Sequence, residues 1–526
     1  MPPACSRPPR PDARPQFQLN KRLLLDAVLG IAILWALLLG LSFGLEAFGL
    51  GAPTNASNWS RGFDANARYI LPDPEVEGGY VTQFQFTNGK EQQIAPRSDR
   101  PRVLLFGGSN THGFPAGYLM RELNKKSKRK RPWEVINLGR SGYGSARVRI
   151  IFEQALELLD PDLVVLYAGH NEFVERGFAL DLEDGDRPSD SGLAALARST
   201  RLYRSFANHY AQSTDQAKAP IVKPEAWKWE YEKFSELTYG ETKAQMGAYQ
   251  DNVRAMCEMA RERKVEVLLS TIVHNRLSMP FVSTIADSIS PTDRENFRSL
   301  RTRALALFPP ALKPLMPTSS EERVHGFDYG KGEPRKSVGK AVLRGSRELS
   351  GRLKGRPHML QQESRWKPKV RVLDTALHQL HNRVISDEDR IAVEQAEGFL
   401  REALTLVPDH PHALFELGLC EILLGRSGQQ IHEHLEQAAS FDRAPRKGSD
   451  MQNELVRQVA QEVDGVVLCD VDSQFEACMP MNVIGWEVMT DHCHMTLGAR
   501  HVVMEIFAET IDDEWPKGSF DTKGSQ

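Results

Sequence analysis

Residues 103–111 decide the fold, and their sequence is Val103-Leu-Leu-Phe-Gly-Gly-Ser-Asn-Thr111. A short apolar run that ends at glycines is typical of a buried strand in a parallel sheet. A Ser at a tight, glycine-rich turn between strand and helix projects its hydroxyl above the edge of the sheet. The spacing is not G-x-x-x-x-G-K-[ST], and G-x-G-x-x-G is absent here, so we predict no phosphate-binding loop.

Strands and helices alternate along the chain that follows. Short apolar runs predict further strands at 133–138, 162–167, 265–271 and 466–470. Helical patterns occur near 117–126, 146–159, 250–263, 453–463 and 497–511. This alternation predicts an α/β fold in which helices cover both faces of an open parallel sheet. Ligand sites of such sheets lie at the carboxyl ends of the strands.

Residues with useful chemistry follow the first three predicted strands. Ser109 follows the first, Gly142 lies in a glycine-rich loop after the second, and Asn171 lies in Ala168-Gly-His-Asn-Glu172 after the third. A glycine lets the backbone approach a substrate, and an Asn amide can donate a hydrogen bond to an oxyanion. Each motif alone also fits an ordinary turn between a strand and a helix.

A fourth motif, Asp491-His-Cys-His494, precedes the last predicted helix. A catalytic His needs a partner that fixes its tautomer and stabilises the imidazolium, and Asp491 can turn back to His494. The alternative is an Asp that caps the helix beside surface histidines. A metal site of His170, His492 and His494 lacks any supporting spacing such as H-E-x-x-H. We therefore predict no metal and no other cofactor.

Together the four motifs resemble the SGNH hydrolase superfamily, also called GDSL-like, named after Ser, Gly, Asn and His in four separate blocks. The family's order and its Asp-x-x-His spacing are both present, in Ser109, Gly142, Asn171, Asp491 and His494. The resemblance covers about 97–275 and 450–512. One departure is Gly108, where many relatives have the Asp of G-D-S, and it weakens the assignment to a subfamily.

The resemblance implies a flavodoxin-like three-layer sandwich and ester or acyl-group chemistry on carbohydrates or lipids. It implies that Ser109 is the nucleophile, that His494 takes its proton and later returns it, and that Asp491 orients His494. It also implies an oxyanion hole made by the N–H groups of Ser109 and Gly142 and the side-chain amide of Asn171.

The N-terminus predicts a membrane anchor. Residues 27–45 form a run of 19 residues without a charge, close to the roughly 20 that a helix needs to cross a bilayer. Lys and Arg dominate the charges before it, which places the N-terminus in the cytoplasm. We expect a single-pass protein whose catalytic body is extracytoplasmic. The alternative is a cleaved signal peptide, although its apolar core is usually shorter, about 7–15 residues.

A long insertion separates the fourth and fifth predicted strands. Residues 276–390 are rich in Pro, Arg and Ser, and we predict them to be irregular. Residues 391–445 have a helical pattern, and Pro408 and Asp442 lie 34 residues apart. This resembles a tetratricopeptide repeat, whose period is about 34 residues. One interpretation is a groove for a peptide or protein partner, and the other is a helical hairpin that packs on the catalytic domain as a lid or brace.

The bulk composition excludes several classes of protein. The net charge of -3 gives no basic field for nucleic acid, and we predict the basic run Lys125–Arg131 to be a solvated loop. None of the 6 cysteines forms C-x-x-C, which argues against a zinc ribbon or a redox motif.

The leading hypothesis is an esterase that acts on an extracytoplasmic acylated glycan or lipid through an acyl-Ser109 intermediate. The alternatives are an O-acyltransferase with the same residues and a non-catalytic envelope scaffold. The predicted segments are a basic tail (1–26), a transmembrane helix (27–45), a stalk or edge segment (46–96), a first SGNH part (97–275), an irregular insertion (276–390), tetratricopeptide-like helices (391–445), a second SGNH part (446–512) and a tail (513–526).

Overall fold

The computed structural model describes residues 28–30, 32–37, 40–41, 54–55, 63, 67–82, 92–127, 132–176, 237–283, 285–286, 288–309, 385–443, 445, 447–485 and 488–515. The chain divides into two compact units, residues 1–55 with 188–219 and residues 56–187 with 220–526. The first unit includes β1 (Thr54–Asn55) and helical residues within 28–41. Residues 27, 31, 38–39 and 42–45 of the predicted anchor lie outside the described residues. Within the described part of the chain, no helix combines the length and apolar character needed to cross a membrane.

A parallel sheet forms the centre of the second unit. Its strands are β6 (Arg102–Gly107), β7 (Glu134–Asn137), β8 (Leu163–Tyr167), β9 (Glu266–Ser270) and β10 (Val466–Cys469). The spatial order is β10-β9-β8-β6-β7, and every neighbouring pair is parallel. This is the flavodoxin-like order, whose topological switch point lies between β6 and β8. The predicted α/β fold with a parallel sheet is therefore confirmed.

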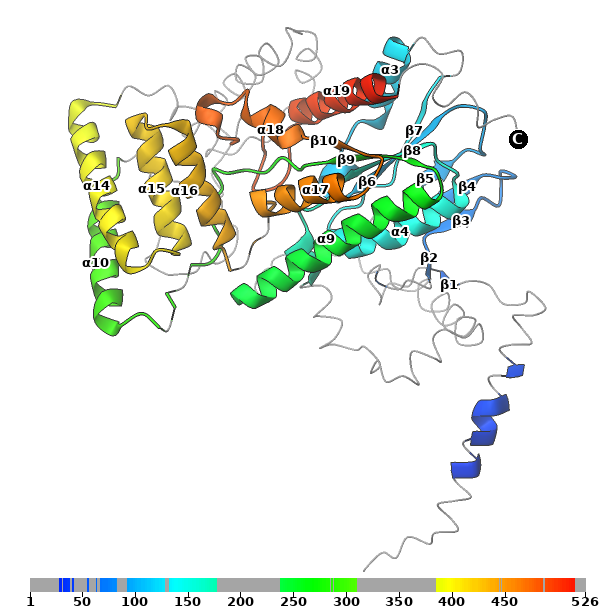
Figure 1. Ribbon diagram of the computed structural model, residues 1–526, viewed down its shortest axis with the longest axis horizontal. Coiled ribbons are helices and arrows are strands. Elements are labelled where there is room, and N and C mark those ends of the chain that lie inside the picture. The colour runs from blue at the N-terminus through cyan, green and yellow to red at the C-terminus, as the bar shows by residue number, and fades with distance from the viewer. Residues whose placement is uncertain are drawn as a thin grey trace, which may run out of the picture. The chain divides into compact units, whose positions relative to one another are not determined.

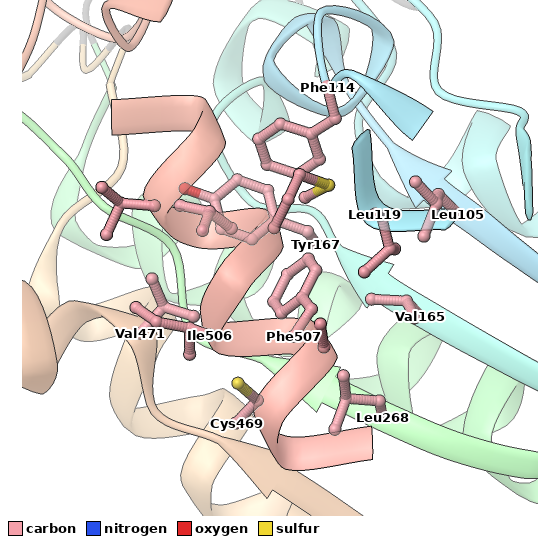
Figure 2. Packing of buried hydrophobic residues seen from close by; sticks show 14 of the residues in the cluster. Leu105, Phe114, Leu119, Val165, Tyr167, Leu268, Cys469, Val471, Ile506 and Phe507 are labelled. Atoms are coloured by element: carbon pink, nitrogen blue, oxygen red, sulfur yellow. The ribbon is translucent and has the colours of Figure 1, made fainter. Parts of the chain in front are cut away.

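Helices cover both faces of this sheet (Figure 1). One face carries α3 (Ala116–Ser127) and α19 (Leu497–Glu514), and the other carries α4 (Ser145–Leu158), α9 (Tyr239–Glu262) and α17 (Asp450–Glu462). Successive strand residues face opposite layers, as the strand period of two requires. Figure 2 shows the α19 side, with Leu105, Val165 and Leu268 of the strands packed with Phe507 of α19.

Burial on both faces explains why the strand sequences are continuously apolar.

Helix α9 starts earlier than its apolar pattern predicts. Helix α9 begins at Tyr239 and not near 250, because Thr238 and Glu241 form a reciprocal capping box at its first turn. This T-x-x-E spacing was present in the sequence and marks the true start.

Part of the predicted stalk belongs to the core of the second unit. Strands β3 (Ile70–Pro72), β4 (Tyr80–Thr82) and β5 (Gln92–Ile94) form an antiparallel sheet, and β2 (Ala67–Arg68) precedes them. Tyr69, Ile70 and Ile94 are buried in the same cluster as the α4 side chains. Within the predicted segment 46–96, residues 69–82 and 92–94 therefore form an edge decoration of the core and not a stalk.

The insertion contains α10 (Pro291–Ala306), α14 (Asp387–Leu406), α15 (Pro411–Leu424) and α16 (Gly428–Ser440). The prediction that 276–390 is irregular is wrong for α10, which starts at a Ser290 cap followed by Pro291. Residues 310–384 lie outside the described residues. The four helices share one hydrophobic cluster that also includes Leu277 and Val483. The tetratricopeptide identity of 391–445 stays a prediction.

Candidate active site

Ser109 lies at the topological switch point, where it begins the short helix α2 (Ser109–His112) directly after β6. Two glycines make this turn possible. A Cβ on Gly107 would lie 1.9 Å from the Tyr167 carbonyl oxygen, and one on Gly108 would lie 2.4 Å from Asn171 Nδ2. The turn therefore packs directly against the end of β8. As a first-turn residue, Ser109 has a backbone N–H without a partner inside its own helix.

The structure brings Ser109, His494 and Asp491 into one hydrogen-bonded line. His494 Nε2 lies 2.8 Å from Ser109 Oγ, and His494 Nδ1 lies 2.8 Å from Asp491 Oδ2. A carboxylate can only accept, so Nδ1–H donates to Asp491 and Nε2 is left to accept from the Ser109 hydroxyl. The side chain of His494 is 35% exposed, so a substrate can reach it. The arrangement places a general base beside a nucleophile, with a third group orienting the base.

The Asp491 carboxylate is fixed at both oxygens. Its Oδ1 accepts the backbone N–H groups of Cys493 at 2.8 Å and His494 at 2.7 Å. Burial alone would raise its pKa, but the hydrogen bond and charge of His494 and the Cys493 amide hold the pKa of Asp491 well below its usual range. Asp491 therefore remains ionised at neutral pH, as a group that stabilises an imidazolium must.

Asn110 ties the nucleophile to the loop that carries the base. Its Nδ2 donates to the Cys493 carbonyl at 2.6 Å, and its Oδ1 accepts the Met495 N–H at 3.0 Å. These two contacts bracket His494 on both sides. Asn110 is 1% exposed, so water does not compete for them. Sequence analysis missed this role, and its only signal was the position next to Ser109.

The three predicted oxyanion donors come from loops that meet at Gly108. The Asn171 Nδ2 donates to the Tyr143 carbonyl at 3.1 Å, and a Cβ on Gly108 would lie 3.0 Å from that same carbonyl oxygen. Gly142 has φ +76°, a left-handed turn conformation that favours glycine. The Ser109, Gly142 and Asn171 motifs are thus neighbours in space.

Two acidic residues beside Asn171 hold the Gly142 loop in place, and sequence analysis missed both. Helix α4 begins at Ser145, and Gly144 before it is the N-cap residue and offers no side-chain cap. Glu175 Oε1 accepts the Gly144 N–H at 2.9 Å, and Glu172 Oε1 accepts the Ser145 N–H at 2.9 Å. Burial and the nearby Glu175 raise the pKa of Glu172 above its usual range. The carboxyl groups of Glu172 and Glu175 therefore hold the start of α4, and the Gly142 loop before it, against the loop that carries Asn171.

His170 contacts Asn110, whose Nδ2 lies 3.3 Å from His170 Nε2, and it is not a member of the Ser109–His494–Asp491 line. It is 5% exposed, and its Nε2 lies 2.8 Å from the Val273 carbonyl. Burial lowers the pKa of His170 to about 4, so the ring is neutral at neutral pH. His492 packs edge-on against Phe281 instead, with ring centroids 5.4 Å apart.

Two groups of possible metal ligands occur among the described residues, Asp491-His492-Cys493 and His274 with Glu436 and Asp450. In the first group, N–H donors already occupy both oxygens of the Asp491 carboxylate. In the second, the guanidinium of Arg276 lies 2.8 Å from Glu436 and 2.7 Å from Asp450. In the second group a guanidinium therefore already lies between the carboxylates.

Comparisons with known proteins add little. No family model matches the chain, and no curated protein matches it. The solved structures found include a GDSL-like lipase of Bacteroides thetaiotaomicron and a candidate acylhydrolase of Bacteroides fragilis, each 16% identical, with 34% of this chain and 53% of the other covered. The chain thus spans about half the length of these structures, and the TM-scores are 0.17 and 0.16. TM-scores this low support no conclusion about this chain, so its fold and its site are described from the strand order and the site geometry.

Proposed function

We propose that this chain is a serine-dependent ester hydrolase of the SGNH type that works through an acyl-Ser109 intermediate. One observation carries the proposal. Ser109 Oγ, His494 and Asp491 form an unbroken line with both hydrogen bonds at 2.8 Å. The line lies at the carboxyl ends of β6 and β8, where sheets with this strand order bind their ligands.

In the first half-reaction, Ser109 Oγ attacks the ester carbonyl carbon while His494 Nε2 takes the hydroxyl proton. The tetrahedral intermediate then collapses, the bond from the carbonyl carbon to the alcohol oxygen breaks, and His494 returns the proton to the leaving alcohol. Asp491 stabilises the imidazolium that exists between these two proton transfers. The acyl group is now joined to Ser109 as an ester.

In the second half-reaction, His494 takes a proton from a water molecule, and the water oxygen attacks the acyl carbon. When the second tetrahedral intermediate collapses, the bond from the acyl carbon to Ser109 Oγ breaks and His494 returns its proton to Oγ. The carboxylic acid leaves and the Ser109 hydroxyl is restored. The negative charge of both intermediates would be met by the N–H groups of Ser109 and Gly142 and by Asn171. One such donor is typically worth about 3–4 kcal/mol in the transition state.

The substrate we propose is an acylated carbohydrate or lipid outside the cytoplasm, with the chain anchored through residues 27–45. The support is the uncharged run of 19 residues and the positive charge before it. Protease added to intact cells, or to spheroplasts where an outer membrane is present, should digest the catalytic body. A body that survives until the cells are lysed would contradict this orientation.

A fluorophosphonate probe, which reacts with activated serines, tests the reaction directly. Wild-type protein should be labelled, and tryptic peptides should place the adduct on Ser109. Ser109→Ala should not react, whereas Ser98→Ala, which removes an exposed hydroxyl remote from the site, should react at the wild-type rate. A folded wild-type protein that neither reacts with the probe nor hydrolyses p-nitrophenyl acetate would favour the scaffold hypothesis.

A further inference from the structure

We infer that Asn275 is a positioning residue that connects the inserted helices to Asp491, an inference that rests on the proposed function. Asn275 belongs to residues 272–283, which we call the bridge segment because it leads from β9 toward α10. The Asn275 side chain is fully buried. Its Nδ2 donates to the Asp491 carbonyl at 3.0 Å, and its Oδ1 accepts the Leu277 N–H at 3.0 Å. Its amide therefore holds the backbone of a catalytic residue.

A buried lysine fixes Asn275 from the other side. Lys447, which lies between α16 and α17, is 3% exposed. Its Nζ donates to the Asn275 carbonyl at 3.0 Å and to the Ser278 carbonyl at 2.7 Å. An ammonium group buried at this depth is costly unless its donors are satisfied, so these two carbonyls are held firmly.

The next residue of the bridge segment, Arg276, anchors it to three helices. Its backbone N–H donates to the Ile484 carbonyl at 3.0 Å. Its fully buried guanidinium lies 2.8 Å from Glu436 of α16, 2.7 Å from Asp450 of α17 and 3.0 Å from Asp472 of α18 (Val471–Glu476). We call Arg276 and these three acids the Arg276 cluster. Through this cluster, helices α16, α17 and α18 all hold the bridge segment at Arg276.

Further contacts along the bridge segment join the inserted helices to the loop of His494. Asp442, which follows α16, accepts the N–H groups of Phe281 at 2.8 Å and Val282 at 3.0 Å. Phe281 then packs against His492, with ring centroids 5.4 Å apart. The helices thus act as a brace for the catalytic loop, which is one of the two interpretations that the sequence left open.

The position of the Asp491 carboxylate follows from the position of its backbone. Its Oδ1 accepts N–H groups of its own loop, so the carboxylate turns with that loop. Asn110 holds the loop after Asp491, and Asn275 holds it at Asp491 itself. Loss of the Asn275 amide should let the carboxylate drift from His494 Nδ1 without touching Ser109 or the oxyanion donors.

A double-mutant cycle with purified full-length protein and p-nitrophenyl acetate tests this role. Asn275→Ala should lower kcat about tenfold with little change in KM, the size expected from one lost hydrogen bond. In an Asp491→Asn background the same substitution should lower kcat less than about twofold, because the group it positions is already disabled. Asn124→Ala is the control, since it removes an amide that binds the Trp133 backbone far from the site.

A second variant guards against a folding defect in Asn275→Ala. Asn275→Asp keeps the shape and the oxygen that accepts the Leu277 N–H, and it replaces the donor to Asp491 by a second carboxyl oxygen. Because a buried carboxylate can itself lower stability, a thermal melt recorded beside the kinetics must show that the variant is folded. It should also lower kcat about tenfold. Equal losses in both backgrounds, or losses no larger than those of Asn124→Ala, would show that Asn275 is merely structural. A folded wild-type protein without activity would overturn the proposed function itself. An active wild-type protein with equally active Asn275 variants would overturn only the role of Asn275.

Discussion

The active-site line and the Arg276 cluster are both built from charged and polar side chains, yet they differ in their relation to water. The side chains of His494 and Asp491 are 35% and 28% exposed. Those of Arg276, Asp472 and Glu436 are 0%, 1% and 10% exposed, whereas Asp450, at 32%, lies at the edge of the cluster. Exposure leaves the first set open to a substrate and to protons from solvent. Burial makes Arg276, Asp472 and Glu436 depend mainly on their pairing with other side chains.

This difference predicts opposite responses to substitution. Removal of a group from the active-site line should lower turnover and leave the free energy of unfolding nearly unchanged, because water replaces the lost contact. Removal of a charge from the Arg276 cluster should lower stability first, because the mostly buried groups left behind lose their main partner of opposite charge. The two regions meet at the bridge segment, where Asn275 and Arg276 are adjacent, so neighbouring residues should give different phenotypes.

The largest effect should come from Ser109→Ala and His494→Ala. Each should lower kcat for p-nitrophenyl acetate by about 10⁶, and the double variant should be no slower, because the two groups act as one unit. Thermal melting should stay close to wild type in all three. Purely additive losses, or a large fall in melting temperature, would mean that the line of hydrogen bonds is structural.

A smaller loss is expected from Asp491→Asn, which keeps the size of the side chain. It should lower kcat by about 10⁴, because an amide can present its NH₂ to His494 and favour the wrong tautomer. The fold should persist, since Oδ1 can still accept the Cys493 and His494 N–H groups. Steady-state kinetics with denaturation curves measures both quantities. Activity within tenfold of wild type would remove Asp491 from the mechanism.

Arg276→Ala tests the other side of the comparison. It leaves Glu436, Asp450 and Asp472 without their shared cation, and breaking a buried ion pair costs about 3–5 kcal/mol. Urea denaturation should show a loss of that size, whereas Arg263→Ala, at an exposed position, should change stability by less than about 0.5 kcal/mol. A loss below about 1 kcal/mol would show that water or a rearranged lysine can replace Arg276.

The sequence predicted the active-site line and not the Arg276 cluster, for a physical reason. In a parallel sheet all carboxyl ends lie at one edge, so motifs after successive strands must meet even when far apart in the chain. This places Ser109 and Asn171 side by side, and the Asp491-x-x-His494 spacing supplies the base. No such rule brings positions 276, 436, 450 and 472 together. Their contacts depend on how the inserted helices pack, which periodicity does not encode.

The same limit explains the smaller errors. Asn110 and Asn275 act through backbone carbonyls and amides, and any polar residue can occur at such positions, so no pattern distinguishes them. Helix α10 was missed because Pro and Arg dominate the composition around it. Its buried positions, Phe297, Leu300 and Ala304, nonetheless lie three and four residues apart, which is the helical spacing.

The smallest effect expected lies at the border of the Arg276 cluster, at His432 of α16. Its Nε2 lies 2.9 Å from Asp450 Oδ2, and its Nδ1 lies 3.3 Å from Glu476 Oε1. The hydrogen bond to Asp450 raises the pKa of His432 above 6.5, against the opposing effects of partial burial and of the Arg276 charge. A His with a raised folded pKa stabilises the protein fully below its unfolded pKa. That contribution is lost as the pH rises through the folded pKa.

His432→Gln should therefore cost stability only on the acid side. The side chain is 22% exposed, so solvent screening limits the loss to about 1 kcal/mol or less near pH 5.5, declining toward zero near pH 8.5. Urea denaturation at the two pH values measures the difference. His501→Gln is the control, because the ring nitrogen of His501 lies 2.8 Å from a backbone carbonyl and not from a carboxylate. A loss that is equal at both pH values would mean that His432 contributes packing and no charge. The Arg276 cluster would then keep its acids in place without help from the charge of His432.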